Sequence, residues 1–114
     1  MKPLLIGSSL FLLGQSLIWI QTNGQFVWPW FKKNPFIVSM IFGTVISYLL
    51  IFATRNVVGY FDGLLWPSRF IGFSTGILTF ASLTWIFLGE GINLKTAVSL
   101  VLSLILILIQ LFWK

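Results

Sequence analysis

Polar side chains inside the apolar stretches of this 114-residue sequence are the first candidates for chemistry. Thr75, Thr79 and Ser82 recur at helical spacing, so their hydroxyls share one face where they can hydrogen-bond a solute that has left water. Gln15 is the one strongly polar side chain well inside an apolar stretch, and a buried amide is costly without a partner. Two interpretations stay open for these residues: the wall of a solute pocket, or contacts that hold helices together.

Aromatic side chains supply further candidate walls for such a pocket. Because aromatic residues make up 18% of the chain, an aromatic neighbour is expected at almost any site, and these candidates carry less weight than the polar ones. The predicted substrate-binding residues are Gln15, Trp19, Tyr48, Thr75, Thr79 and Trp85.

The side chains that most enzymes and metal sites use are missing from the sequence. It has no Cys and no His, which removes thiol nucleophiles, Ser-His-Asp hydrolysis and metal sites built on thiolate or imidazole. Its two carboxylates, Asp62 and Glu90, both fall between apolar stretches. We therefore expect no catalytic residue, no metal site and no cofactor, and no enzymatic activity.

Long apolar stretches, each with at most one charged residue near its start, are separated by short charged clusters and must position the candidate residues. A hydrocarbon core about 30 Å thick requires roughly 20 apolar helical residues to cross it. The stretches that qualify are residues 3–20, 36–53, 67–88 and 94–113. The sequence therefore predicts an all-α fold, an integral membrane four-helix bundle that forms a single domain over residues 1–114.

Composition supports the membrane assignment. Charged residues are 8% of the chain, against roughly 25% in an average soluble domain. The net charge of +5 comes from Lys and Arg scattered over the chain ends and all connections, which favours anionic lipid over nucleic acid as partner. Residues 15–20 offer no small-residue cleavage motif, so the first helix is expected to be retained rather than cleaved as a signal. We expect a multi-pass protein of the bacterial inner (plasma) membrane.

The connections carry interfacial features. Residues 21–35 are expected to lie along one interface because they contain Trp28, Trp30 and a Lys pair. Residues 57–66 are predicted to form an interfacial turn or short helix rather than part of a span, since glycines and Asp62 interrupt them. Asn93 is a predicted N-cap for the last helix.

Small residues predict where helices meet. Helix association in lipid depends on close backbone approach, which glycine and serine allow. The predicted packing residues are Gly7 and Gly14 in the first span, Ser39, Gly43 and Ser47 in the second, and Gly72 and Gly76 in the third.

The distribution of cations gives almost no orientation signal. Lys2, Arg55, Arg69 and Lys114 fall on the side of the termini, which is slightly favoured as cytoplasmic, while Lys32, Lys33 and Lys95 fall on the other. Such balance is typical of a protein that inserts in both orientations, and two opposed copies can then enclose a cavity that opens alternately to each side. A small protein with a weak signal is the alternative.

Short motifs in residues 50–113 resemble a known group. Residues 55–60, read Arg-Asn-Val-Val-Gly-Tyr, precede the basic Arg69 and the pair Gly89-Glu90 before a last apolar helix. This pattern is similar to the small four-helix branch of the drug/metabolite transporter superfamily. The resemblance implies a fold like that of small multidrug resistance proteins, which work as antiparallel dimers and exchange cations for protons through a first-helix glutamate. This chain has no acid in its first span, and Gln15 is the nearest polar substitute.

We therefore expect a small transporter-like membrane protein, dimeric or paired with a related subunit, that binds or moves a small amphipathic or neutral solute. The alternative is a non-transporting accessory or structural subunit that docks its small-residue faces on a larger membrane complex. A pore-forming, holin-like protein is disfavoured because the sequence lacks a highly charged C-terminal tail.

Overall fold

The computed structural model describes residues 1–113, and within that range it is helical with no strand. The elements are α1 (Lys2–Asn23), the 3₁₀ turn η1 (Gly24–Phe26), α2 (Pro29–Lys33), α3 (Pro35–Tyr60), α4 (Trp66–Leu88) and α5 (Leu94–Phe112). Four of the helices, α1, α3, α4 and α5, are long and apolar enough to cross a membrane. The all-α, membrane-spanning helical bundle predicted from the sequence is confirmed.

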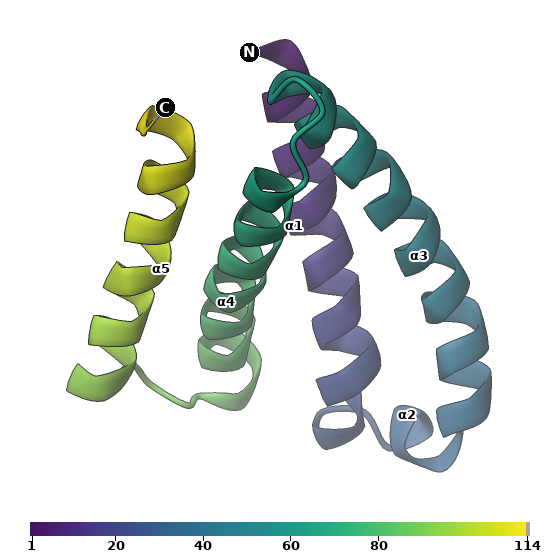
Figure 1. Ribbon diagram of the computed structural model, residues 1–114. Helices are drawn as coiled ribbons and strands as arrows, with labels where there is room; N and C mark the ends of the chain where they lie inside the picture. Colours follow the sequence, from purple (N-terminus) through teal and green to yellow (C-terminus); the bar gives the residue numbers. More distant parts are fainter. Residues whose placement is uncertain (114) are drawn as a thin grey trace.

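The four long helices form an open row in the order α3, α1, α4, α5 (Figure 1). The first helix lies between α3 and α4, whereas α5 packs mainly against α4. The molecule is correspondingly flat, with extents of 47 × 35 × 18 Å. Because α1 has a neighbour on each side, the core cluster forms around it: Leu4 and Phe11 of α1 meet Ala53 and Val57 of α3 and Ile71 of α4.

Local sequence explains where the helices begin and end. Proline occupies the first turn of α1, α3 and α4, where its missing N–H would have had no helical partner. The side chain of Asn93 accepts a hydrogen bond from the Thr96 amide at 2.8 Å, so the predicted N-cap of α5 is confirmed. Gly89 ends α4 with a φ of +68°, a conformation that favours glycine.

The end of α3 differs from the sequence prediction. Residues 57–60 continue the helix instead of opening an interfacial segment, and the turn comes only at Asp62 and Gly63, both with positive φ. Val57 is fully buried against α1, so packing extends the helix past the point where Arg55 and Gly59 suggested a boundary. At the other end of the chain, α5 stops at Phe112; Trp113 follows it, and Lys114 lies outside the described residues.

Glycines of α1 allow close contact with α3. A Cβ built on Gly7 would lie 2.5 Å from Val57 Cγ2 and 3.0 Å from the backbone oxygen of Ala53. On Gly14 it would lie 3.1 Å from Leu50 Cδ2. The two glycines thus sit where α3 approaches α1 most closely, as their heptad spacing suggests.

The face that α3 uses is not the predicted one. The buried residues of α3 are Val38, Ile46, Ala53 and Val57. Ser39 and Ser47 are exposed, and Gly43 is half-buried, with Gln21 Oε1 3.7 Å from its built Cβ. The reason is complementarity: since α1 supplies the small residues, α3 can present larger side chains, and its own small residues are turned away.

Glycines of α4 receive side chains of α1. A Cβ on Gly72 would lie 3.1 Å from Phe11 Cε1, and one on Gly76 would lie 3.0 Å from Gln15 Oε1. The predicted Gly72-xxx-Gly76 pair is therefore in the α1–α4 contact, with bulky side chains of α1 over both glycines.

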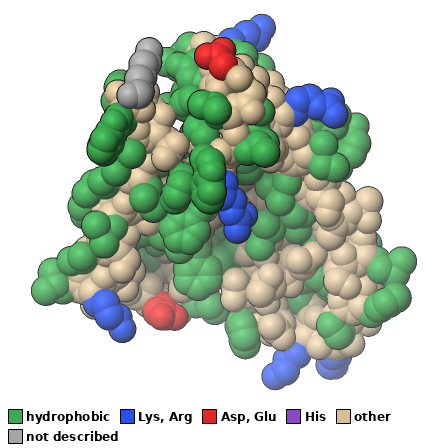
Figure 2. Space-filling view, viewed as in Figure 1, with side chains coloured by type: hydrophobic (Ala, Val, Ile, Leu, Met, Phe, Trp, Pro, Cys, Tyr) green, Lys and Arg blue, Asp and Glu red, His purple; other side chains and the backbone are tan. Residues whose placement is uncertain are grey.

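Both termini lie at the same ends of the long helices, at the top in Figure 1, together with the connection between α3 and α4. The η1–α2 segment and the connection between α4 and α5 lie at the opposite ends. Lys and Arg side chains gather at both ends of the face in view, and one also lies in a hollow in its middle (Figure 2). Termini on the same side of the molecule are what an even number of membrane crossings requires.

We expect cysteine labelling to reproduce this topology. Gln25 and Asn93 are exposed at one end, and Asp62 is exposed at the other. In vesicles with a uniformly oriented population, a membrane-impermeant thiol reagent should label cysteines at residues 25 and 93 from one side and at residue 62 from the opposite side. Labelling of all three positions from a single side would contradict four crossings.

Candidate functional site

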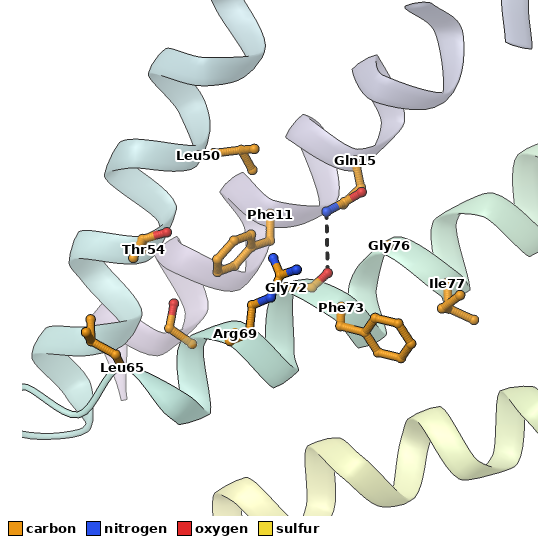
Figure 3. A pocket seen from close by; sticks show the side chains of 11 residues that line it. Phe11, Gln15, Leu50, Thr54, Leu65, Arg69, Gly72, Phe73, Gly76 and Ile77 are labelled. Atoms are coloured by element: carbon orange, nitrogen blue, oxygen red, sulfur yellow. Dashed lines mark hydrogen bonds between the residues drawn. The ribbon is translucent and has the colours of Figure 1, made fainter. Parts of the chain in front are cut away.

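A pocket of about 450 Å³ lies between α1, α3 and α4 (Figure 3). Its volume falls in the range of small-molecule sites, roughly 300–1,000 Å³. The residues that line it are Phe11, Gln15, Leu50, Thr54, Leu65, Ser68, Arg69, Gly72, Phe73, Gly76 and Ile77. The pocket therefore combines an apolar wall with an amide, two hydroxyls and one guanidinium.

The side chain of Gln15 makes one weak hydrogen bond in this pocket. Its Nε2 donates to the Gly72 carbonyl oxygen at 3.4 Å, a long hydrogen bond (Figure 3). The same oxygen accepts a shorter bond, 2.9 Å, from Thr75 Oγ1. Because Thr75 already satisfies the carbonyl, the Gln15 amide can exchange its weak contact for one to a solute at little cost.

Arg69 brings the only charge among the residues that line the pocket. It is the fourth residue of α4, and its side chain points inward beside Phe11 and Gly72 (Figure 3). Guanidinium stays protonated at physiological pH and offers five N–H donors in a planar fork. The Arg69 side chain is exposed, so the guanidinium is accessible to a ligand in the pocket, and an ionisable side chain within a predicted span is typical of a binding site or a transport path.

The carboxylates lie elsewhere. Asp62 lines a separate pocket at the end of the molecule, with Trp66 and Gln110. Glu90 lines a third pocket between α4 and α5, where Lys95 is its cationic neighbour. Within residues 1–113 no group of three His, Cys, Asp or Glu side chains is placed to hold a metal ion.

Of the predicted substrate-binding residues, Gln15 alone lines this pocket. Tyr48 and Trp85 point outward, with exposed fractions of 64% and 60%, because α3 and α4 turn these positions away from α1. Thr75 and Thr79 are buried in the α4 packing face, and Thr75 bonds to its own helix. The predicted hydroxyl face is thus mainly a packing face, which agrees with the second of the two interpretations left open by the sequence, contacts that hold helices together.

Trp19 packs between α1 and α4 and does not line the pocket. It is 2% exposed, its Nε1–H donates to Thr84 Oγ1 at 2.9 Å, and its ring packs on Phe87 with 5.6 Å between centroids. The indole therefore links α1 to α4 near the ends of these helices that lie opposite the chain termini. Thr84, absent from the predicted set, supplies the matching oxygen.

Removal of this hydrogen bond should be measurable. Trp19→Phe keeps the aromatic packing on Phe87 but leaves Thr84 without its donor. We expect the free energy of unfolding in a detergent titration to fall by about 0.5–2 kcal/mol, the range for interhelical hydrogen bonds in membranes. Trp85→Phe, on the exposed side of α4, is the control and should leave stability unchanged. Equal stability of both variants would show that the indole–threonine bond contributes nothing.

Sequence reasoning missed most of the polar lining. The sequence places Arg69 at an interface, at the start of a predicted span, and Ser68 on the small-residue face of that span. Thr54, beside Arg55, carries no prediction. The signal was available in one respect: Arg69 falls inside the apolar stretch 67–88, two residues past the proline that begins it. An arginine at that position lies within the helix, so its side chain can extend toward the neighbouring helices.

Comparison of the chain with protein-family models, with curated proteins and with solved structures finds no match. The chemistry of the pocket between α1, α3 and α4 is therefore the basis for assigning a function.

Proposed function

We propose that this chain is a small transporter-like membrane protein that binds or moves a small amphipathic or neutral solute, and that it acts as a dimer. The observation that carries this proposal is the pocket between α1, α3 and α4, in which an amide, hydroxyls and a guanidinium face an apolar wall. A mostly apolar cavity with a few convergent polar groups is the usual form of a small-molecule site, and sites between helices are common in bundles.

The dimer is proposed because the helices form a single row. A molecule 18 Å thick leaves the polar pocket uncovered on one face, and a second copy placed on that face would shield the solute from lipid. The nearly even distribution of cations over both ends is compatible with either a parallel or an antiparallel pair. Membership of the drug/metabolite transporter superfamily and placement in a bacterial inner membrane are part of the same proposal.

Two measurements on purified protein test it. Mass determination in mild detergent should give twice the mass of one chain, with no other protein present. In nanodiscs, the same protein should bind an amphipathic probe in a saturable way that empty nanodiscs do not show. A monomer without saturable binding would contradict the proposal.

The alternative function is that of an accessory or structural subunit in a larger membrane complex. It is favoured by α5, of which Ser103 alone is buried and most of whose large apolar side chains are exposed, so that they are available to lipid or to another protein. Co-purification of further subunits in fixed stoichiometry, together with absence of solute binding, would support this alternative instead.

A further inference from the structure

We infer that the solute of this pocket is an amphipathic anion, whose charged group the Arg69 guanidinium binds while its apolar body lies along the wall of the pocket. The inference rests on the proposed function and specifies the class of solute. The shared chemistry is a carboxylate or phosphate on an apolar chain, and its source is either a free solute or the headgroup of an anionic lipid.

Charge is the first argument. Arg69 is the one ionisable side chain in the lining, and neither carboxylate of the chain lines this pocket. The Arg69 side chain is exposed, so its charge is accessible to a solute that enters the pocket and attracts an anion. The binding of an anion therefore supplies the pairing that the described residues of the pocket do not.

Position on the helix is the second argument. Arg69 belongs to the first turns of α4, where the aligned peptide dipoles place partial positive charge. A cation there adds to the positive potential instead of offsetting it. The potential at this end of the pocket is consequently positive from two sources, the side chain and the helix.

Hydrogen-bonding groups share the lining of the pocket with the guanidinium. Ser68 and Thr54 bring hydroxyls from α4 and α3 to the same lining, and Gln15 brings the weakly bonded amide described above. Carboxylate and phosphate oxygens accept from all of these donors, and arginine binds them in bidentate fashion. Three helices thus contribute donors toward one anionic group.

The shape of the lining explains why the solute has an apolar body. Arg69 and Ile77 are eight residues apart on α4, about 12 Å along the helix axis. Between them the wall is formed by Phe11, Leu50 and Phe73. A compact inorganic anion would leave this apolar wall exposed to water, whereas an anion with an alkyl or aryl chain covers it.

Three probes matched in chain length test the charge selectivity: decanoate, decyltrimethylammonium and 1-decanol. Binding of each labelled probe is measured by dialysis against phosphatidylcholine nanodiscs with and without the protein. We expect decanoate to bind at least about tenfold more tightly than the other two, as for a hydrogen bond to a charged group. Equal binding of all three would overturn the inference and leave the proposed function standing; binding of none would overturn both.

Variants locate the site. Arg69→Gln should weaken decanoate binding at least about tenfold. Arg69→Lys keeps the charge and loses the planar fork, so its affinity for decanoate should lie between that of the unaltered chain and that of Arg69→Gln. Arg55→Gln is the control, because Arg55 is likewise an exposed cation but does not line the pocket, and its guanidinium lies 4.7 Å from the Phe52 ring centroid. Unchanged decanoate binding by Arg69→Gln would overturn the inference; if that variant does not fold, the probe comparison on the unaltered chain decides.

The source of the anion is distinguished by adding phosphatidylglycerol to the nanodiscs. If an anionic lipid headgroup occupies the pocket, phosphatidylglycerol displaces decanoate and co-purifies with the unaltered chain but not with Arg69→Gln. If the solute is a free amphipathic anion, decanoate binding stays the same in both lipid compositions. Either result supports an anion site at Arg69 and identifies its occupant.

Discussion

Gly7→Ala is expected to lower the free energy of unfolding by about 1–3 kcal/mol, the usual cost of an extra methyl group in a well-packed contact. The added Cβ would lie 2.5 Å from Val57 Cγ2, and within 3.1 Å of the Ala53 backbone oxygen and the Val57 backbone nitrogen. Backbone atoms cannot move aside as the end of a flexible side chain can. Relief therefore requires α1 and α3 to separate. Reversible unfolding in a detergent titration measures the effect.

Gly59→Ala is the matched control. It makes the same chemical change in the last turns of α3, where a Cβ would meet nothing within 4 Å and φ is not positive. Its stability should equal or slightly exceed that of the unaltered chain because alanine favours helix. Should Gly7→Ala unfold at the same detergent concentration as Gly59→Ala, the close approach of α1 to α3 would be wrong.

Reconstituted protein is expected to show no proton-coupled uptake of quaternary ammonium compounds above that of protein-free vesicles. Coupled exchange needs a group in the membrane that holds either a proton or the substrate cation, and a carboxylate usually does this. In the pocket of this chain the polar residue of the first span is Gln15, whose amide cannot titrate, and Arg69 in the same lining repels a cation. Uptake driven by an imposed pH gradient is the measurement.

Gln15→Glu should convert the pocket into a pH-sensitive one. The new carboxylate would share the pocket with Arg69, its one charged neighbour in the lining, and would compete with a bound anion for the guanidinium. Binding of decyl sulfate, an anion of the same chain length that stays ionised at low pH, should then weaken at high pH, where the glutamate is ionised, and recover at low pH, where it is neutral. Proton-coupled cation transport by the unaltered chain, abolished by Glu90→Gln, would instead show that Glu90 is the coupling group.

The helices could be predicted from the sequence because their signal is uniform along each span. A stretch of about twenty mostly apolar residues admits few alternatives in a bilayer. Asn93 marks the start of its helix by a local hydrogen bond that needs no tertiary contact. The register between helices is less predictable. Ser39 and Ser47 have the spacing of a packing face, yet the glycines of α1 accept Ala53 and Val57 instead. Small residues mark where close approach is allowed, and the partner decides whether it happens.

The candidate site was predictable only in part for the same reason. Gln15 stands out because an amide in an apolar stretch is rare, and it does line the pocket. Arg69 counted as an interfacial charge because the sequence shows its distance from the helix end but not the direction of its side chain. Trp19 looked like a pocket wall, and only the position of Thr84, 65 residues away in the sequence, reveals its hydrogen bond.

The peripheral position of α5 bears on how the chain assembles during synthesis. The core cluster joins Leu4 and Phe11 of α1 to Ala53 and Val57 of α3 and to Ile71 of α4, all of which leave the ribosome before α5 begins at Leu94. The last helix then joins a unit whose buried contacts already exist, and it attaches mainly to α4. A failure to insert α5 would accordingly leave the three-helix unit and its polar pocket in place, since no residue of α5 lines that pocket.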